Sequence, residues 1–178
     1  MSVIKSGQNG NTANVNDQGQ VEVASVSETS LEYASKTNKK AYSWLSTYAA
    51  TGGEEVIYIK NDSTSDVLVV DEVVIGSSVA SVFTIFEVNS GTAAGTVLTA
   101  GNLNLSSGNT APTSAFGNAS VTGSLTGMTV AVDGVVAGGF ETLDMKGALV
   151  LGQNDEIAVT ASATGTVYVT VIGHFKAA

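Results

Sequence analysis

Cysteine and arginine are missing from this chain of 178 residues, and proline, histidine and tryptophan each occur once. Without cysteine there is no disulfide framework, no thiolate metal site and no cysteine nucleophile. All 7 basic residues are lysines, and the chain has 16 acidic residues, which gives a formal net charge of -9. An acidic chain without arginine is a poor partner for nucleic acid, because phosphates need positive counter-charge. We therefore expect no nucleic-acid partner.

Long apolar runs are also missing. The longest nearly apolar stretch, residues 67–75, is interrupted by Asp71 and Glu72 and is far too short to cross a bilayer. No apolar run follows Lys5 near the start of the chain, so the sequence predicts neither a Sec signal peptide nor a membrane partner. Apolar residues nevertheless make up 43% of the chain, which argues against global disorder, and the length suits one folded domain.

From about residue 41 onward, short β-strand patterns alternate with turn residues. We expect strands at residues 54–60, 67–75, 82–88, 96–100, 103–105, 121–132, 135–137, 148–151, 156–161 and 166–175, with a polar loop at 106–118. Asp133 and Gly134 stand between valines and predict a two-residue hairpin turn, since a type I′ turn needs positive φ at both positions. This spacing of strands and turns predicts an all-β sandwich or barrel.

Residues 38–50 fit two structures. Ala41, Trp44, Leu45 and Tyr48 have helical spacing, whereas Tyr42, Trp44 and Tyr48 share one face of a strand. We favour the strand, because aromatic side chains suit pleated surfaces and the rest of the chain is β.

Several expected strands are apolar on both faces. In residues 166–175, Val167, Val169 and Val171 lie on one face, while Tyr168 and Ile172 lie on the other. Residues 56–59 are likewise apolar on both sides. Such strands need cover on both faces, and in a single domain a second subunit could supply it. We therefore expect a homo-oligomer whose subunit interface includes the aromatic residues Trp44, Tyr58 and Tyr168.

The first 35 residues are expected to form an extended N-terminal arm ahead of a β-sandwich domain at residues 36–178. Residues 6–20 are rich in turn formers and lack the apolar spacing of a helix or core strand. Val21 and Val23 then alternate with polar residues, which is a short strand signal. Two interpretations stay open: a flexible terminus, or an arm that buries Val15, Val21 and Val23 on a partner surface.

The sequence offers no catalytic constellation, and we expect a protein that is not an enzyme and holds no metal or cofactor. Ser2 and Lys5 match a Ser-x-x-Lys spacing but lack partner motifs. His174 is interpreted as a surface or interface histidine. Asp62 and Asp66 are expected to be solvated loop acids, although their oxygens could bind Ca²⁺.

Two features resemble virion structural proteins of tailed bacteriophages. The N-terminal pattern is SGQNGNTANVNDQGQVEV at residues 6–23, which looks like the arms that open many phage head and tail accessory proteins. The second feature is an ordered series: YIKNDS (58–63), LVVDEVVI (68–75), GTVLTAGNLNLSSGNTA (95–111) and ALVLGQNDEIAV (148–159). This order is similar to marine phage virion proteins thought to form jelly rolls, and it spans most of the chain.

The resemblance implies a jelly-roll-like antiparallel β-sandwich that acts as a capsid decoration, or cement, protein. It implies a homotrimer on the capsid surface of a virion, assembled in the host cytoplasm, with the major capsid protein as partner. The arm, with Val15, Val21 and Val23, would contact the capsid. The alternative is a head-fibre or tail-fibre module that recognises host glycans through Trp44 or Tyr48. A polysaccharide depolymerase would need two converging carboxylates, which the local sequence does not provide.

Overall fold

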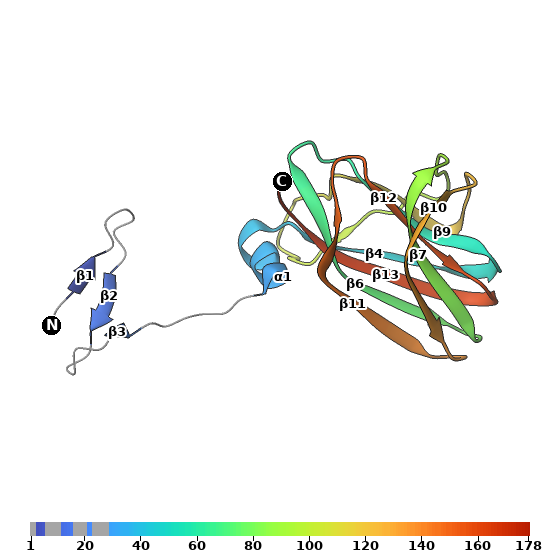
Figure 1. Ribbon diagram of the computed structural model, residues 1–178, viewed down its shortest axis with the longest axis horizontal. Helices are drawn as coiled ribbons and strands as arrows, with labels where there is room; N and C mark the ends of the chain where they lie inside the picture. Colours follow the sequence, from blue (N-terminus) through green and yellow to red (C-terminus); the bar gives the residue numbers. More distant parts are fainter. Residues whose placement is uncertain (1–2, 6–11, 16–20, 23–28) are drawn as a thin grey trace.

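The computed structural model describes residues 3–5, 12–15, 21–22 and 29–178 (Figure 1). A helical segment opens the last of these ranges, with the α-helix α1 (Ser30–Tyr33) continuing into a π-helical turn, η1 (Ala34–Asn38). The strands that follow are β4 (Ala41–Thr51), β5 (Glu54–Asn61), β6 (Asp66–Ser77), β7 (Ser81–Ser90), β8 (Gly101–Asn102), β9 (Thr113–Val121), β10 (Thr126–Val135), β11 (Phe140–Leu151), β12 (Glu156–Ala161) and β13 (Thr164–Ala177).

Within residues 29–178, these strands form two five-stranded antiparallel sheets that pack face to face. One sheet has the order β10-β7-β12-β5-β9 and the other has the order β11-β6-β13-β4-β8. Strands β4 to β7 enter the two sheets alternately, and β10 to β13 return beside them, so each late strand lies between or next to early ones. This wrapping of eight strands is the strand order of a jelly roll, with β8 and β9 inserted between β7 and β10. The predicted all-β, jelly-roll-like sandwich is therefore confirmed.

The core lies between the two sheets and follows the period-2 alternation of the strands. Val167, Val169 and Val171 of β13 are fully buried, as predicted from their common face. The strand interpretation of residues 38–50 is also confirmed, because β4 points Tyr42 and Trp44 into the same core. Burying each of these large side chains contributes about 1.5–3 kcal/mol.

One side of the sandwich is closed by hydrogen bonds between β4 and β9. The Oγ of the fully buried Ser46 accepts from the backbone N–H of Asn118 at 2.7 Å and donates to the carbonyl oxygen of Val56 at 2.7 Å. Trp44 Nε1 donates to Thr113 Oγ1 at 3.2 Å. Gly117 fits here because a Cβ at this position would lie 2.7 Å from Ser46 Oγ. The two sheets are therefore joined along this side by polar groups with partners.

Several local predictions are wrong. Asp133 and Gly134 do not form a hairpin turn: they lie inside β10, opposite Phe83 and Val82 of β7. The chain turns instead after β10, where Gly138 takes a positive φ of 73°. The polar loop expected at 106–118 also ends early, because residues 113–121 form strand β9. The strands expected at 96–100 and 103–105 are replaced by isolated bridges, turns and the two-residue strand β8.

The second face of β5 is covered by the chain itself. Tyr58 packs with Phe86, Val88, Val121, Leu125 and Ala158 in a small apolar cluster outside the main core. Phe116 of β9 stacks beside Tyr58 with ring centroids 5.8 Å apart. The doubly apolar pattern of residues 56–59 predicts cover on both faces, which a second subunit could supply. In the structure this cover comes from neighbouring strands and the segment around Leu125.

The predicted arm is described in part. β1 (Val3–Lys5) pairs with β2 (Thr12–Val15), and β2 pairs with β3 (Val21–Glu22), all antiparallel. The helical segment 30–38 was not predicted. It begins with a capping box, in which Glu32 N donates to Thr29 Oγ1 at 3.2 Å and Thr29 N donates to Glu32 Oε2 at 3.1 Å. The hydrogen bond from the Thr29 backbone lowers the pKa of Glu32.

Replacing Ser46 by alanine should destabilise the closed side of the sandwich. The change leaves the Asn118 N–H and the Val56 carbonyl without their side-chain partner, and an orphaned buried polar group costs about 1–3 kcal/mol. The matched control is Ser43→Ala on the outer face of the same strand, which should change the free energy of unfolding by less than about 0.5 kcal/mol. Urea unfolding of both variants measures the difference, and equal effects would contradict this role for Ser46.

Candidate functional site

The side of the sandwich opposite the β4–β9 contact is formed by β10 and β11. β10 is an edge strand of one sheet and β11 is an edge strand of the other. The turn at residues 136–139 joins them. Six of the large apolar side chains exposed in the described residues gather on these two strands and their turn: Met128, Val130, Val132, Val136, Phe140 and Val150. We call this set the open edge.

The open edge also leaves the core partly uncovered. Leu143, Met145 and Leu149 of β11 pack against the main core but are only half-buried. Met128 is 62% exposed, Val132 58% and Val136 75%. Val132 pairs with Thr84 on the outer face of its sheet, whereas Met128 pairs with Glu87 on the face toward the other sheet. Scattered exposed apolar residues are normal on a protein surface, but their concentration on two adjoining edge strands is a mark of an interaction surface. This edge is the main candidate functional site.

Charge is sparse along β10. No charged residue occurs between Thr126 and Val132, and the first acid, Asp133, stands near the end of the strand. The backbone is bulged at Val130, because Thr129 pairs with Phe86 and Ala131 pairs with Ile85, so Val130 has no partner residue in β7. The stretch of β10 from Thr126 to Val132 is therefore uncharged and bulged, whereas β11 on the same side of the sandwich carries the exposed acids Glu141 and Asp144.

Phe140 connects the open edge to the outer face of the β11-β6-β13-β4-β8 sheet. Its ring lies over Gly76, where a Cβ would overlap the ring. The ring also packs against Tyr168 of β13, with centroids 5.5 Å apart. Tyr168, one of the three expected interface residues, is half-buried at this position and keeps accessible surface.

The other two expected interface residues have almost no accessible surface. Trp44 is 0% exposed in the main core, and Tyr58 is 4% exposed in the second cluster. Burial, followed by the nearby Glu156, raises the pKa of the Tyr58 hydroxyl. A second copy of the chain could not reach either side chain in this fold, so of the three only Tyr168 lies where a partner could contact it.

The expected capsid-contact valines lie in the N-terminal region. The backbone pairs Val15 of β2 with Val21 of β3. Val23 lies outside the described residues. Their role in contacting a capsid remains a prediction.

A second candidate is a groove of about 1190 Å³ between the helical segment 30–38 and the outer face of β6, β11 and β13. His174 is buried there, and its Nδ1 lies 2.7 Å from Asp71 Oδ2. Since an ionised carboxylate only accepts hydrogen bonds, this contact places the ring proton on Nδ1. The histidine expected on the surface or at an interface is thus held inside the chain by a carboxylate.

Strand bulges create the groove. Opposite Ile172 and Gly173 of β13, strand β6 carries one extra residue, Asp71. Opposite the same point, β11 loops out between Asp144 and Leu149. Both irregularities turn polar residues outward at one level of the sheet, while Val70 and Val73 stay in the core on either side.

The groove has acidic walls but no metal geometry. Asp71, Glu72 and Asp144 line it together with Lys146 and Lys176. In the described part of the chain, no group of three or more histidine and acidic side chains is arranged to hold a metal ion. His174 and Asp71 therefore form a structural pair, and we assign them no chemistry.

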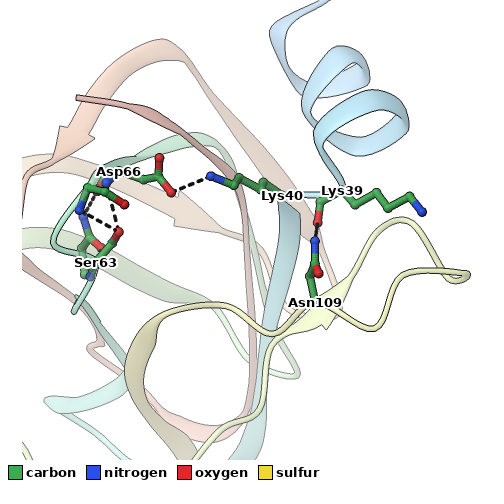
Figure 2. Close-up of polar contacts among 7 residues, drawn as sticks. Lys39, Lys40, Ser63, Asp66 and Asn109 are labelled. Atoms are coloured by element: carbon green, nitrogen blue, oxygen red, sulfur yellow. Dashed lines mark hydrogen bonds and ion pairs between the residues drawn. The ribbon is translucent and has the colours of Figure 1, made fainter.

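Asp62 and Asp66 are partnered by other side chains. Figure 2 shows Lys40 Nζ at 2.7 Å from Asp66 Oδ2, and Ser63 Oγ accepting from Asp66 N at 3.0 Å. Asp62 Oδ2 accepts from Ser114 Oγ at 2.7 Å. In the same view the Lys39 carbonyl accepts from Asn109 Nδ2 at 3.3 Å, which ties the loop before β9 to the end of the helical segment.

Comparisons with protein-family models, with curated proteins and with solved structures find no match to this chain. In the ranges that the structure describes, a helix able to span a bilayer is not found.

The open edge was not predicted from the sequence. The alternation of Met128, Val130 and Val132 predicts a strand, but a strand pattern does not say whether the strand is central or at an edge. The absence of lysine and proline from residues 126–135 was an available signal, though an ambiguous one, because both buried and edge strands can lack them.

Replacing Asp71 by alanine should destabilise the fold by about 1.5–3 kcal/mol, because buried His174 loses a hydrogen bond to a charged partner. Glu72→Ala is the matched control: it removes a carboxylate from the same groove that makes no hydrogen bond among the described residues. We expect the control to lie within about 0.5 kcal/mol of the unchanged protein. Chemical denaturation reports both values, and a larger loss for Glu72→Ala would refute the assignment.

Proposed function

We propose that this protein is a structural component of a bacteriophage virion, which binds the major capsid protein and reinforces the shell as a decoration protein. In this proposal the chain acts as a homotrimer, is assembled in the host cytoplasm, is anchored by its N-terminal arm and performs no catalysis. The observation that carries the proposal is the open edge: the jelly roll closes its core on the β4–β9 side and leaves apolar residues uncovered on β10 and β11. Exposed apolar surface of this kind is typical of proteins that bind a partner.

Assembly on a shell also suits the way an arm would bind. An extended segment can add to the edge of a neighbouring sheet, where main-chain hydrogen bonds supply affinity. Residues 3–5, 12–15 and 21–22 already have strand backbone, which is the conformation this mode requires. Three arms on one trimer would bind a regular lattice with a high effective concentration, so weak individual contacts suffice.

The alternative, a fibre module that recognises host glycans, has less support. Trp44, one of the two side chains expected to stack on a sugar, is fully buried. Tyr48, the other, is half-buried with its hydroxyl 3.4 Å from Glu54 Oε2 and 3.3 Å from the Glu55 carbonyl oxygen. Burial and the negative charge of Glu54 raise the pKa of Tyr48. Neither ring is placed to contact a sugar.

Deleting residues 1–23 should abolish binding to the shell while leaving a folded oligomer. The test is co-sedimentation with empty shells made from the major capsid protein encoded in the same genome, with circular dichroism and light scattering to follow folding and mass. Binding is expected to be lost because the proposal makes the arm the anchor, and folding is expected to survive because strands β4 to β13 of the sandwich all lie within residues 41–177.

A second variant separates the arm's side chains from its length. Replacing Val15, Val21 and Val23 by serine should weaken shell binding, whereas serine at the exposed Val97, Leu103 and Leu105 should not. Full binding by the deletion variant would show that the arm is not the anchor. No binding by the unchanged protein would contradict the decoration role itself.

A further inference from the structure

We propose that the groove between the helical segment 30–38 and the outer face of β6, β11 and β13 binds a neutral oligosaccharide. Its volume of about 1190 Å³ exceeds the roughly 300–1,000 Å³ of pockets that hold drug-sized ligands, so it has room for more than one sugar ring. The groove contains neither Trp44 nor Tyr48. Sugar binding here adds an activity to the decoration role, because neither the shell nor the N-terminal arm takes part in it.

His174 gives the first reason, because it is a buried polar side chain with one ring nitrogen unpaired. The residue is 4% exposed, and its Nδ1 lies 2.7 Å from Asp71 Oδ2. Among the described residues Nε2 has no hydrogen-bond partner, and no side-chain nitrogen or oxygen there is both fully buried and unpartnered. Nε2 therefore keeps accessible surface in the groove that His174 lines. With the proton on Nδ1, Nε2 of the neutral ring accepts a hydrogen bond from a ligand.

The charged side chains of the groove favour an uncharged ligand. Glu72, Asp144, Lys146 and Lys176 line it, and no ion pair joins these four side chains in the part of the chain that the structure describes. An anion would be repelled by the carboxylates and a cation by the ammonium groups. A hydroxyl group can donate to a carboxylate and accept from an ammonium group. A ligand rich in hydroxyls therefore satisfies both kinds of side chain.

The helical side of the groove adds an aromatic face and neutral polar groups. Tyr33 lines the groove and is 51% exposed. Ser30 and Asn38 also line it, and their side chains have no hydrogen-bond partner among the described residues. A sugar ring has a face of C–H groups and a rim of hydroxyls, so it can pack on an aromatic ring while its rim meets hydroxyl, amide and carboxylate groups.

An extended peptide fits this place less well. Peptide strands are bound through main-chain hydrogen bonds to an open sheet edge. The floor of the groove is the face of a sheet instead: β6 pairs with β11 and β13, and β13 pairs also with β4. The groove thus offers its ligand side chains and not a free backbone edge.

Isothermal titration calorimetry of the full-length chain tests the ligand class. The neutral probes are trisaccharides of glucose, galactose, mannose and N-acetylglucosamine. The galacturonic acid trimer is the acidic probe, and trialanine is the zwitterionic peptide probe. We expect at least one neutral trisaccharide to bind more tightly than both of the charged probes, because it alone leaves neither the carboxylates nor the ammonium groups of the groove facing a like charge.

Two substitutions test the groove with the tightest neutral probe. Tyr33→Ala removes the stacking face, and Phe140→Ala is the matched control, because Phe140 is a 61% exposed ring packed on Tyr168 and lies outside the groove. His174→Asn removes Nε2, while the shorter amide can still donate to Asp71 near the Nδ1 position. Circular dichroism and urea unfolding establish that each variant is folded.

The dissociation constant should rise about tenfold for Tyr33→Ala and about three- to tenfold for His174→Asn, and Phe140→Ala should leave it unchanged. Glu72→Gln, with Glu141→Gln outside the groove as its control, replaces His174→Asn if that variant does not fold, and should weaken binding by a similar factor. Failure of every neutral trisaccharide to bind, tighter binding of a charged probe, or an unchanged constant in the folded groove variants would overturn the proposal. Shell co-sedimentation is scored separately and tests the decoration role alone.

Discussion

A two-layer sandwich must close the space between its sheets on both sides, and this requirement is met unequally here. On the β4–β9 side, Ser46 is hydrogen-bonded to Asn118 and Trp44 is hydrogen-bonded to Thr113. The polar groups there have partners, and the apolar side chains beside them are buried. On the β10–β11 side, Leu143, Met145 and Leu149 remain half-buried. The difference between the closed β4–β9 side and the incompletely buried β10–β11 side is the basis of the proposed function.

The strands with clean period-2 alternation were predictable because one face of each enters the core. β13 and β12 follow this pattern over nearly their whole length, and both have the residues expected of them. β9 could not be found in the same way, since its inward positions are Ala115 and Gly117, small residues that read as a loop. Their size is required by the close approach of Leu98 and Ser46. The Asp133–Gly134 turn signal was overridden because β10 continues alongside β7 to Val135. The pairing of β10 with β7 therefore outweighed the local turn preference of Asp133 and Gly134.

The site was less predictable than the fold. Apolar residues on both faces of a strand indicate a second layer of cover, but a sequence does not show whether that layer is another subunit or another part of the same chain. For Tyr58 the layer is the segment around Leu125 and Val121, and for His174 it is the helical segment 30–38. Tyr168 alone of the expected interface aromatics keeps accessible surface, because only Phe140 of the edge strand β11 reaches over it, across Gly76 of β6.

The extra residue in β6 has a consequence for how this strand tolerates changes of length. Leu68, Val70, Val73 and Ile75 all face inward, and the interval of three between Val70 and Val73 exists only because Asp71 is accommodated in a bulge. Losing Asp71 from the gene would restore strict alternation through the whole strand without reversing either half. A single-residue deletion in a central strand normally moves every side chain beyond it to the opposite face of the sheet. Here the buried residues on both sides of the deletion would still face the core. Related chains one residue shorter at this point would therefore keep the jelly roll and lack the carboxylate beside the histidine.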